Sequence, residues 1–433
     1  MGPGTCNPNP CGGATTTTTT STTTTTTTIT AAPTTTGMTT STSTTSTTMP
    51  TGSCQCGTPD PTRLQFTTAV GTGNCGVTTK NDGTTALNLA CGELYVGGSS
   101  AVPPTFVVPD MSTSLTKVTA CSGTALTLGN LASTETGSNR NCTSVGCLFG
   151  PPLPMPNTFN PPYSVCVINL VASNATGTAD CSSGAASIGL PLTSAVYLDG
   201  DLFEQSGGQD HCVGGTNPGT VCTMNSQCTG GGFCSAGVQA CPICAGDGKC
   251  HGGGNDGAAC TPADSALNSN FPTSQDCPPP SGNSIGSLSI ALALTTGTKT
   301  VTATDQPSQA RVFCGFCRDA TNTGCFAGDP NPTCPAGPTA AVPCNSDADC
   351  AALVNYPNCQ QQTSGAFGLG GANVRTITET GVPGGAISDG TAHASTLVGI
   401  VCIPPTFNAG VDLGFDWPGP GAVSLPGTAQ LLP

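Results

Sequence analysis

The amino-acid sequence predicts an all-β protein with an antiparallel sandwich or barrel-like domain. Short runs rich in Val, Ile, Leu and Thr alternate with clusters of Gly, Asn, Pro and Ser, which is the pattern of strands joined by turns. Helix signals are nearly absent, because the 59 Gly and 38 Pro together exceed a fifth of the 433 residues and interrupt helices repeatedly. The 28 cysteines add disulfides to the expected sources of stability.

The N-terminal stretch is expected to stand apart from the β-domain. Residues 1–13 form a predicted small knob in which Cys6 and Cys11 can pair. Residues 14–53 are dominated by Thr and Ser, and such a run has too little apolar surface to offset the entropy of ordering it. We expect a disordered linker or stalk, either O-glycosylated or an unmodified spacer. The chain opens without a recognisable signal peptide.

Strand-like runs follow on both sides of a cysteine-rich segment. The runs before it are 63–70, 86–96, 105–108, 115–120, 163–172 and 188–203. The runs after it are 285–302, 311–313, 374–378 and 397–403, with a Pro/Gly-punctuated tail around 423–425. Neither set obviously completes a sheet alone. We therefore predict one β-domain made of 54–205 and 283–433, interrupted by a disulfide-stapled, turn-rich insert at 206–282; two consecutive sandwiches are the alternative.

The insert contains an internal repeat. The pattern C-x-G-G-x-N-x-G-x-x-C occurs at 212–222 and again at 250–260, while Cys334, Cys344 and Cys350 reproduce only its cysteine spacing. Gly and Asn accept positive φ at little cost, so each unit is expected to form tight turns. With little apolar surface, the units need disulfides, each contributing ~2–3 kcal/mol. The candidate cysteines are Cys212, Cys222, Cys228, Cys234, Cys241, Cys244, Cys250, Cys260, Cys277, Cys314, Cys317, Cys334, Cys344, Cys350 and Cys359.

Composition also restricts the compartment and the partners. The cysteine content favours an oxidising environment, so we expect an extracellular or cell-surface location. The formal net charge of −14 argues against nucleic acid and against anionic membrane surfaces as partners. The best apolar run, around 287–294, is shorter than the ~18 residues that a membrane helix needs, so no membrane span is expected.

Metal binding is possible at a few positions. Asp199, Asp201 and Glu204 place oxygen ligands close together at a predicted strand end, which suits calcium. The segment 345–349 is a weaker calcium candidate. The C-x-x-C pairs at 241–244 and 314–317 offer four thiolates for zinc, but structural disulfides are the preferred interpretation among so many cysteines. No other cofactor is expected.

One motif resembles a catalytic site. Residues 282–286 match G-x-S-x-G around Ser284, and Asp389 and His393 follow in the order of an α/β-hydrolase triad. The nucleophile of that fold sits between a strand and a helix, whereas here prolines precede the motif and a strand-like run follows it. We therefore predict no catalytic residue from this motif.

The repeats carry a resemblance to known sequences. Segments 212–234 and 250–277 resemble the short cysteine-rich modules of uncharacterised exported proteins from bacteria with large secretomes. The run 165–169 and the tail 418–427 also look like those proteins. The resemblance covers much of 150–433 and implies export and a single long domain. That family has no assigned activity, so the resemblance carries over no site residue.

These observations predict an exported structural or adhesive protein of the cell surface or extracellular space, without catalysis. Its expected partners are itself, through pairing of sheet edges, or other surface components. Two alternatives are kept: an extracellular hydrolase with a carboxylate pair that sequence cannot identify, and a carbohydrate- or calcium-binding module.

Overall fold

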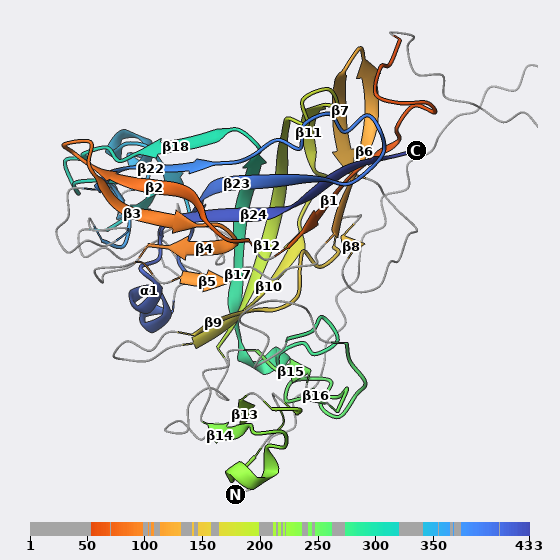
Figure 1. Cartoon of the computed structure of the whole chain (residues 1–433). Coiled ribbons are helices and arrows are strands. Elements are labelled where there is room, and N and C mark those ends of the chain that lie inside the picture. Colours follow the sequence, from red (N-terminus) through yellow and green to blue (C-terminus); the bar gives the residue numbers. More distant parts are fainter. Residues whose placement is uncertain are drawn as a thin grey trace, which may run out of the picture. The chain divides into compact units, whose positions relative to one another are not determined.

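Antiparallel strands make up most of the described structure, a computed structural model (Figure 1). It describes residues 53–69, 71–97, 103, 105–107, 113–130, 141–142, 146–156, 164–198, 211–213, 215–217, 220, 222–235, 241–244, 247–261, 273–319, 341–353, 355–363, 367, 374–406 and 408–433. The predicted knob at 1–13 and nearly all of the predicted stalk at 14–53 lie outside these residues. The predicted all-β class is confirmed.

The elements below keep the labels of Figure 1. The strands are β1 (Arg63–Thr68), β2 (Asn74–Lys80), β3 (Thr85–Ala90), β4 (Glu93–Val96), β5 (Thr105–Val107), β6 (Thr113–Ser122), β7 (Ala125–Asn130), β8 (Asn141–Cys142), β9 (Leu153–Pro156), β10 (Ser164–Val171), β11 (Thr176–Asp180), β12 (Ala186–Leu198), β13 (His211–Val213), β14 (Phe233–Ser235), β15 (Ile243–Cys244), β16 (Cys250–His251), β17 (Ser284–Thr295), β18 (Thr298–Thr302), β19 (Gly315–Arg318), β20 (Pro343–Cys344), β21 (Asn358–Gln360), β22 (Val374–Thr380), β23 (His393–Ile403) and β24 (Gly419–Leu432). The described helices are α1 (Ala409–Phe415) and the 3-10 turns η2 (Asn225–Gln227), η3 (Ser281–Asn283) and η5 (Asp347–Cys350).

The largest sheet closes on itself. Its main path runs β1-β6-β7-β11-β12-β17-β23-β24, and β1 also pairs with β24, so these eight strands form a ring of antiparallel neighbours. β4 and β5 extend the sheet from β24, and β10 and β9 extend it from β12. Strands from both sides of the cysteine-rich segment therefore share one sheet, since β12 pairs with β17 and β1 pairs with β24.

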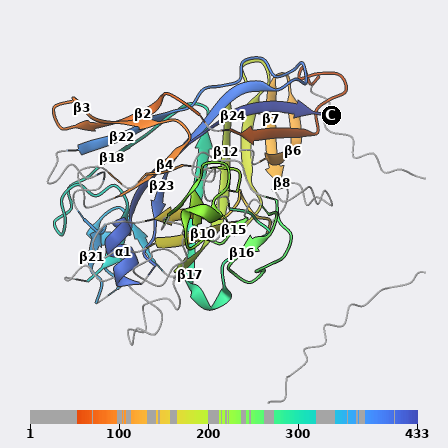
Figure 2. The ribbon, with the colours of Figure 1, turned by 60° about the horizontal axis from the view of Figure 1, so that its bottom comes forward.

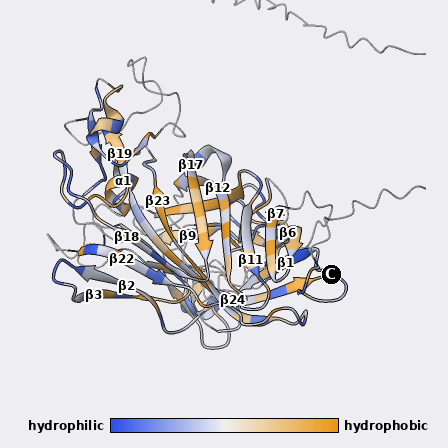
Figure 3. Cartoon of the chain, turned by 90° about the horizontal axis from the view of Figure 1, so that it is seen from above, coloured by the Kyte–Doolittle hydropathy of each residue, from blue (hydrophilic) through white to orange (hydrophobic). Residues whose placement is uncertain are grey.

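β23 and β24 form a layer that is buried on both faces. They pair without a break from His393↔Ala429 to Ile403↔Gly419. Val401 and Val423 belong to the main apolar core against β12 and β17, whereas the adjacent Ile400 and Ala422 belong to a second core under the four-stranded sheet β18-β22-β2-β3. In Figure 3, β12, β17 and β23 carry most of the hydrophobic colour, while β2, β3, β18 and β22 are pale to blue.

Alternation of apolar and polar residues explains β17. Leu288, Ile290, Leu292 and Leu294 are buried while residues between them are exposed, as expected where one face of a strand meets the core. The predicted run at 285–302 is in fact two strands. The chain turns at 296–297 and continues as β18 in the smaller sheet, and the Gly381 N–H donates to the Gly297 carbonyl at 3.0 Å.

Disulfides tie the strands to each other and to the loops. Cys54–Cys121 and Cys56–Cys181 join the first described segment to β6 and to the end of β11, and Cys75–Cys91 joins β2 to the end of β3. Cys166–Cys241 fastens the cysteine-rich segment to β10, and Cys314–Cys402 joins the start of β19 to β23. Among the described residues, no helix is long and apolar enough to cross a membrane.

Closure of the ring depends on a glycine. A Cβ on Gly427 would overlap the carbonyl oxygen of Thr67 on β1, whereas a Cβ on Gly282 would meet no atom within 4 Å. We expect Gly427→Ala to lower the free energy of unfolding by about 1–3 kcal/mol through overpacking. Gly282→Ala should change it by less than about 0.5 kcal/mol. Denaturant unfolding of both variants tests this, and equal stabilities would contradict it.

Candidate functional site

The predicted calcium ligands do not form a described site. Asp199, Asp201 and Glu204 all lie outside the described residues. In the weaker candidate, Asp347 Oδ1 accepts hydrogen bonds from the Cys359 N–H at 2.6 Å and from the Ser308 hydroxyl at 2.9 Å. Asp349 Oδ2 accepts from the N–H groups of residues 345 and 346, and these bonds lower its pKa. These carboxylates therefore satisfy backbone donors of a turn.

The two C-x-x-C pairs do not form a common cluster. Cys241 is bonded to Cys166 and Cys244 to Cys260. Cys314 is bonded to Cys402 and Cys317 to Cys350. All four sulfurs are oxidised in four separate disulfides, so none is a thiolate that zinc requires.

The G-x-S-x-G motif is not part of a triad. Ser284 begins β17, and the ladder pair between β17 and β23 is Thr295↔Val398, at the other end of β17. At about 3.3 Å per residue, the strand from Ser284 to Thr295 spans roughly 36 Å, and the antiparallel β23 places His393 beyond that point. His393 Nε2 instead lies 2.9 Å from Asp389 Oδ1 in an exposed turn. The aspartate and histidine are together, and the serine is remote.

Three disulfide modules are the most regular constellation in the described structure. In each, two cysteines face one another across a short strand pair: Cys212↔Cys234, Cys250↔Cys244 and Cys317↔Cys359. Each of these cysteines bridges to one of two further cysteines on a connecting turn. The bridges are Cys212–Cys228 with Cys222–Cys234, Cys250–Cys277 with Cys244–Cys260, and Cys317–Cys350 with Cys344–Cys359. We call them the first, second and third modules.

A shared hydrogen bond closes the turn of each module. Two cysteines of each module lie on its connecting turn, outside the pair of facing strands. The residue that precedes the second of them accepts, through its side chain, a hydrogen bond from the backbone N–H of the residue that follows the first. The acceptors are Gln227 Oε1 from Thr223 at 2.6 Å, Asp276 Oδ2 from Thr261 at 3.0 Å, and Asp349 Oδ2 from Asn345 at 2.8 Å. The three modules therefore share this contact at equivalent positions, although the third lacks the glycine pattern.

The module order along the chain differs. In the first and third modules the cysteine on the second strand comes last, at Cys234 and Cys359. In the second module its place is taken by Cys244, which precedes the whole repeat. The second module is thus a circular permutation of the first. In the third module Cys317 occupies the position of Cys212, whereas the spacing had suggested Cys334, which lies outside the described residues.

The repeated Asn makes the same hydrogen bond in both copies, and the repeated Gly has the same backbone conformation. Asn217 Nδ2 donates to the Gln227 carbonyl at 3.0 Å, and Asn255 Nδ2 donates to the Asp276 carbonyl at 2.8 Å. Gly215 and Gly253 have φ of +75° and +76°, and a Cβ on either would overlap a backbone carbonyl oxygen. The repeat pattern is therefore explained by turn geometry.

A second regular surface lies on the four-stranded sheet. Threonines of β18 and β22 face one another in three cross-strand pairs with hydroxyl oxygens 3.3–3.4 Å apart. The pairs are Thr298 with Thr380, Thr300 with Thr378, and Thr302 with Thr376. We call these six residues the threonine face. It is uncharged and hydroxyl-rich, and no sequence motif singled it out because period-two threonines also fit an ordinary exposed strand.

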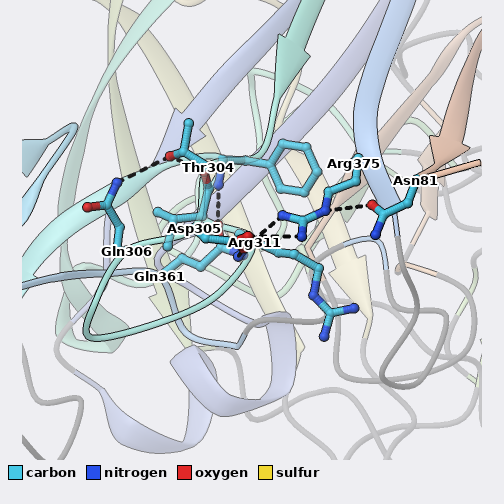
Figure 4. A network of polar contacts seen from close by, with 9 residues as sticks. Asn81, Thr304, Asp305, Gln306, Arg311, Gln361 and Arg375 are labelled. Atoms are coloured by element: carbon cyan, nitrogen blue, oxygen red, sulfur yellow. Dashed lines mark hydrogen bonds and ion pairs between the residues drawn. The ribbon is translucent and has the colours of Figure 1, made fainter.

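The loop beside this sheet is held by an ion pair (Figure 4). Arg375 on β22 donates from Nη1 and Nη2 to the two carboxylate oxygens of Asp305 at 2.8 and 3.0 Å, and its Nε donates to Asn81 Oδ1 at 2.6 Å. The Arg311 N–H also donates to Asp305. The hydrogen bond from Arg375 is the main cause of the lowered pKa of Asp305. The bidentate pair anchors the loop and leaves no reactive carboxylate there.

Buried charges surround α1. Burial lowers the pKa of Arg318 to about 10, and burial raises the pKa of Asp416 to about 6. Thr363 Oγ1 donates to Asp416 Oδ2 at 3.0 Å, which joins the segment after β21 to the end of α1 (Figure 2). Asp412 Oδ1 accepts from both the N–H and the hydroxyl of Thr406 at 2.7 Å. These contacts fix the chain around α1.

Glu379 is the most isolated buried acid among the described residues. It lies on β22 under the small sheet, is fully buried, and neither carboxyl oxygen has a hydrogen-bond partner. Burial alone raises its pKa from the ordinary 4.5 to about 8. The nearby Tyr95, whose hydroxyl accepts from the Ala90 N–H, has its pKa raised to about 12, chiefly by burial. The carboxyl is therefore neutral at pH 7.

The modules should depend on their bridges. Replacing Cys212 and Cys228 by Ser removes a loop constraint of about 3 kcal/mol, and little apolar surface is left to replace it. We expect faster amide hydrogen exchange throughout 211–235. The matched control replaces Cys75 and Cys91, which have the same sequence separation of 16 but join strands packed on an apolar core. Unchanged protection of 211–235 would contradict the prediction.

Glu379 should make stability depend on pH. Its folded pKa is raised, so the folded state binds the proton more tightly than the unfolded state does. Its favourable contribution is complete below the unfolded pKa of about 4.5 and is lost as pH rises toward 8, at up to about 1.4 kcal/mol per pH unit. Asp416 contributes in the same direction up to about pH 6.

The test is denaturant unfolding of wild type and Glu379→Gln across this pH range. Glutamine keeps the shape and removes the titration, so its stability should fall less steeply between pH 6 and 8, above the Asp416 titration. Parallel curves for the two proteins would show that Glu379 is ionised in the folded state.

No protein-family model, no curated protein and no solved structure matches the chain.

Proposed function

We propose that this chain is an extracellular structural or adhesive protein in which disulfide modules supply rigidity and the threonine face supplies contact. One observation carries the proposal: every cysteine whose side chain the structure describes is in a disulfide. Such extensive bonding in an all-β chain fits an extracellular protein, because disulfides persist in oxidising compartments.

The way the modules are built supports a mechanical role. Each module has two disulfides, and three of the four sulfurs in each lie within 4.8 Å of one another. The buried clusters of the first and second modules consist of cysteines, whereas the third also buries Leu353 and Tyr356. Cross-links of this density keep small segments ordered without a large core. The second module is also fastened to the main sheet, through Cys166–Cys241 and a hydrogen bond from the Thr273 hydroxyl to the Pro152 carbonyl at 2.9 Å.

The threonine face supports adhesion to uncharged, hydroxyl-bearing surfaces. Thr298, Thr300 and Thr302 are exposed, and their hydroxyls can each donate and accept hydrogen bonds. β18 also lies at the end of its sheet, so its outer edge can pair with another strand. Neutral polysaccharides and second copies of the chain are the partners that this surface suits.

Reduction should distinguish structural disulfides from labile ones. We expect the intact mass to rise by two hydrogens per bridge only after unfolding in reductant, with at least eleven bridges between described cysteines. Protein taken from its native source should already carry them and be reached by protease added outside intact cells. Free thiols or protection from external protease would overturn the extracellular proposal.

Adhesion has its own test. Thr300→Lys places a charge in the centre of the threonine face and should weaken retention on insoluble neutral polysaccharide or self-association by about tenfold or more, because a buried unpaired charge is costly. Thr127→Lys on β7, another exposed strand threonine, is the control with the same charge change. Equal behaviour of wild type and both variants would remove the threonine face from the proposal.

A further inference from the structure

The main core lines a partly open apolar cavity of about 120 Å³. Its wall is formed by β9, β10, β12 and β17 on one side and by β4, β23 and β24 on the other, with Trp417 following α1. No lining residue is charged, and the only polar lining side chains besides the Trp417 indole are Asn169 and Ser194. Protein cores are normally packed without voids larger than a water molecule, so a space of this size is unusual.

Apart from the Trp417 indole, the polar side chains of the cavity lie at one place. The Ser194 hydroxyl donates to Asn169 Oδ1 at 2.7 Å, so this pair is satisfied internally. The Phe149 N–H donates to the Asn169 carbonyl at 2.8 Å, which sets Phe149 beside the same pair. Phe149, Asn169 and Leu94 are partly buried, whereas most other lining residues are buried. Of these three, Phe149 and Asn169 lie together on one wall, so this side is a candidate for the entrance.

The remaining wall suits an aromatic or short aliphatic molecule. Trp417 is 2% exposed and stacks on Phe415 with ring centroids 5.0 Å apart, which fixes the indole plane. The Trp417 Nε1–H has no hydrogen-bond acceptor among the described residues. Met155, with its flexible and polarisable thioether, can adjust to the shape of an occupant. Apolar cavities of about 150 Å³ are known to stay dry and to bind benzene or xenon.

We propose that this cavity is a binding site for one small uncharged ligand, of about the size of a single aromatic ring, which enters past Phe149 and Asn169. An ionised ligand is excluded, because it would lose its hydration without meeting a counter-charge. A ligand carrying one acceptor oxygen can also accept a hydrogen bond from the Trp417 Nε1–H. The site is separate from the disulfide modules and from the threonine face.

The test uses the full chain and the fluorescence of Trp417, its single tryptophan. Benzene is the probe, and benzoate is the matched control with the same ring and a charge. We expect benzene to change the emission saturably and to raise the melting temperature, with benzoate at least about tenfold weaker. No saturable response to benzene up to its solubility limit, or an equal response to benzoate, would overturn the proposal.

A variant whose cavity is filled by a larger side chain provides a second test. Val167→Phe adds a ring to the lining and should abolish the benzene response, whereas Val301→Phe makes the same enlargement on β18, at the second core. Because Val167→Phe can fail to fold, methyl NMR of the wild type supplies an independent readout. Benzene should shift the methyl signal of Met155 and leave that of Met224, which is 57% exposed, unchanged. Equal shifts of both methyls would mean non-specific binding and would overturn the proposal.

Discussion

The pairing of β23 with β24 is the interaction on which the rest of the structure depends. These two strands separate two cores, so each of their faces needs apolar side chains, and the seven residues that begin β24 are all buried. Two buried faces leave little room, which is why Gly419, Gly421 and Ala422 occur there: a Cβ on Gly421 would press on Ile403 and Val401. The first half of β24 also pairs with β4, and its second half pairs with β1, so loss of this strand would open the ring and detach β4 and β5 from the large sheet.

Outside these cores, covalent bonds replace apolar burial. The first and second modules have a cysteine cluster where a larger domain has aliphatic side chains, and in each a side-chain acceptor bonds across the segment between the two cysteines of the connecting turn. Only 7% of the residues are charged, so the chain can form few ion pairs. The bidentate Arg375–Asp305 contact holds the loop beside the four-stranded sheet. Circular permutation of the second module shows that the structure depends on which cysteines meet and is indifferent to their order along the chain.

The cores also tolerate features that stability alone would not favour. Glu379 is a buried carboxyl without a partner, and the main core keeps a cavity beside Trp417. Burial of a neutral carboxylic acid costs less free energy than burial of a carboxylate anion. Burial therefore favours the protonated form of Glu379 and raises its pKa. Both features lie against the β23–β24 layer, Glu379 on the side of the second core and the cavity on the side of the main core. The same layer therefore lies between the small sheet that carries the threonine face and the cavity that we propose as a ligand site.

The sequence by itself determined the strand content, the turn-rich repeats and the expectation of an oxidised chain, because each depends on local preferences or composition. The strands follow from alternating apolar residues, as in 284–295, and the turns from glycines that accept positive φ, as at Gly215 and Gly253. The expectation of oxidation follows from the cysteine content. The candidate calcium ligands at 199–204 stay predictions. Only the tertiary structure decided which cysteines pair, because Cys317 and Cys244 reach their modules across the chain and spacing carries no such information. It also decided that 285–302 divides between two sheets, that Ser284 is remote from His393, and that the core keeps a cavity, since each depends on which strands lie side by side.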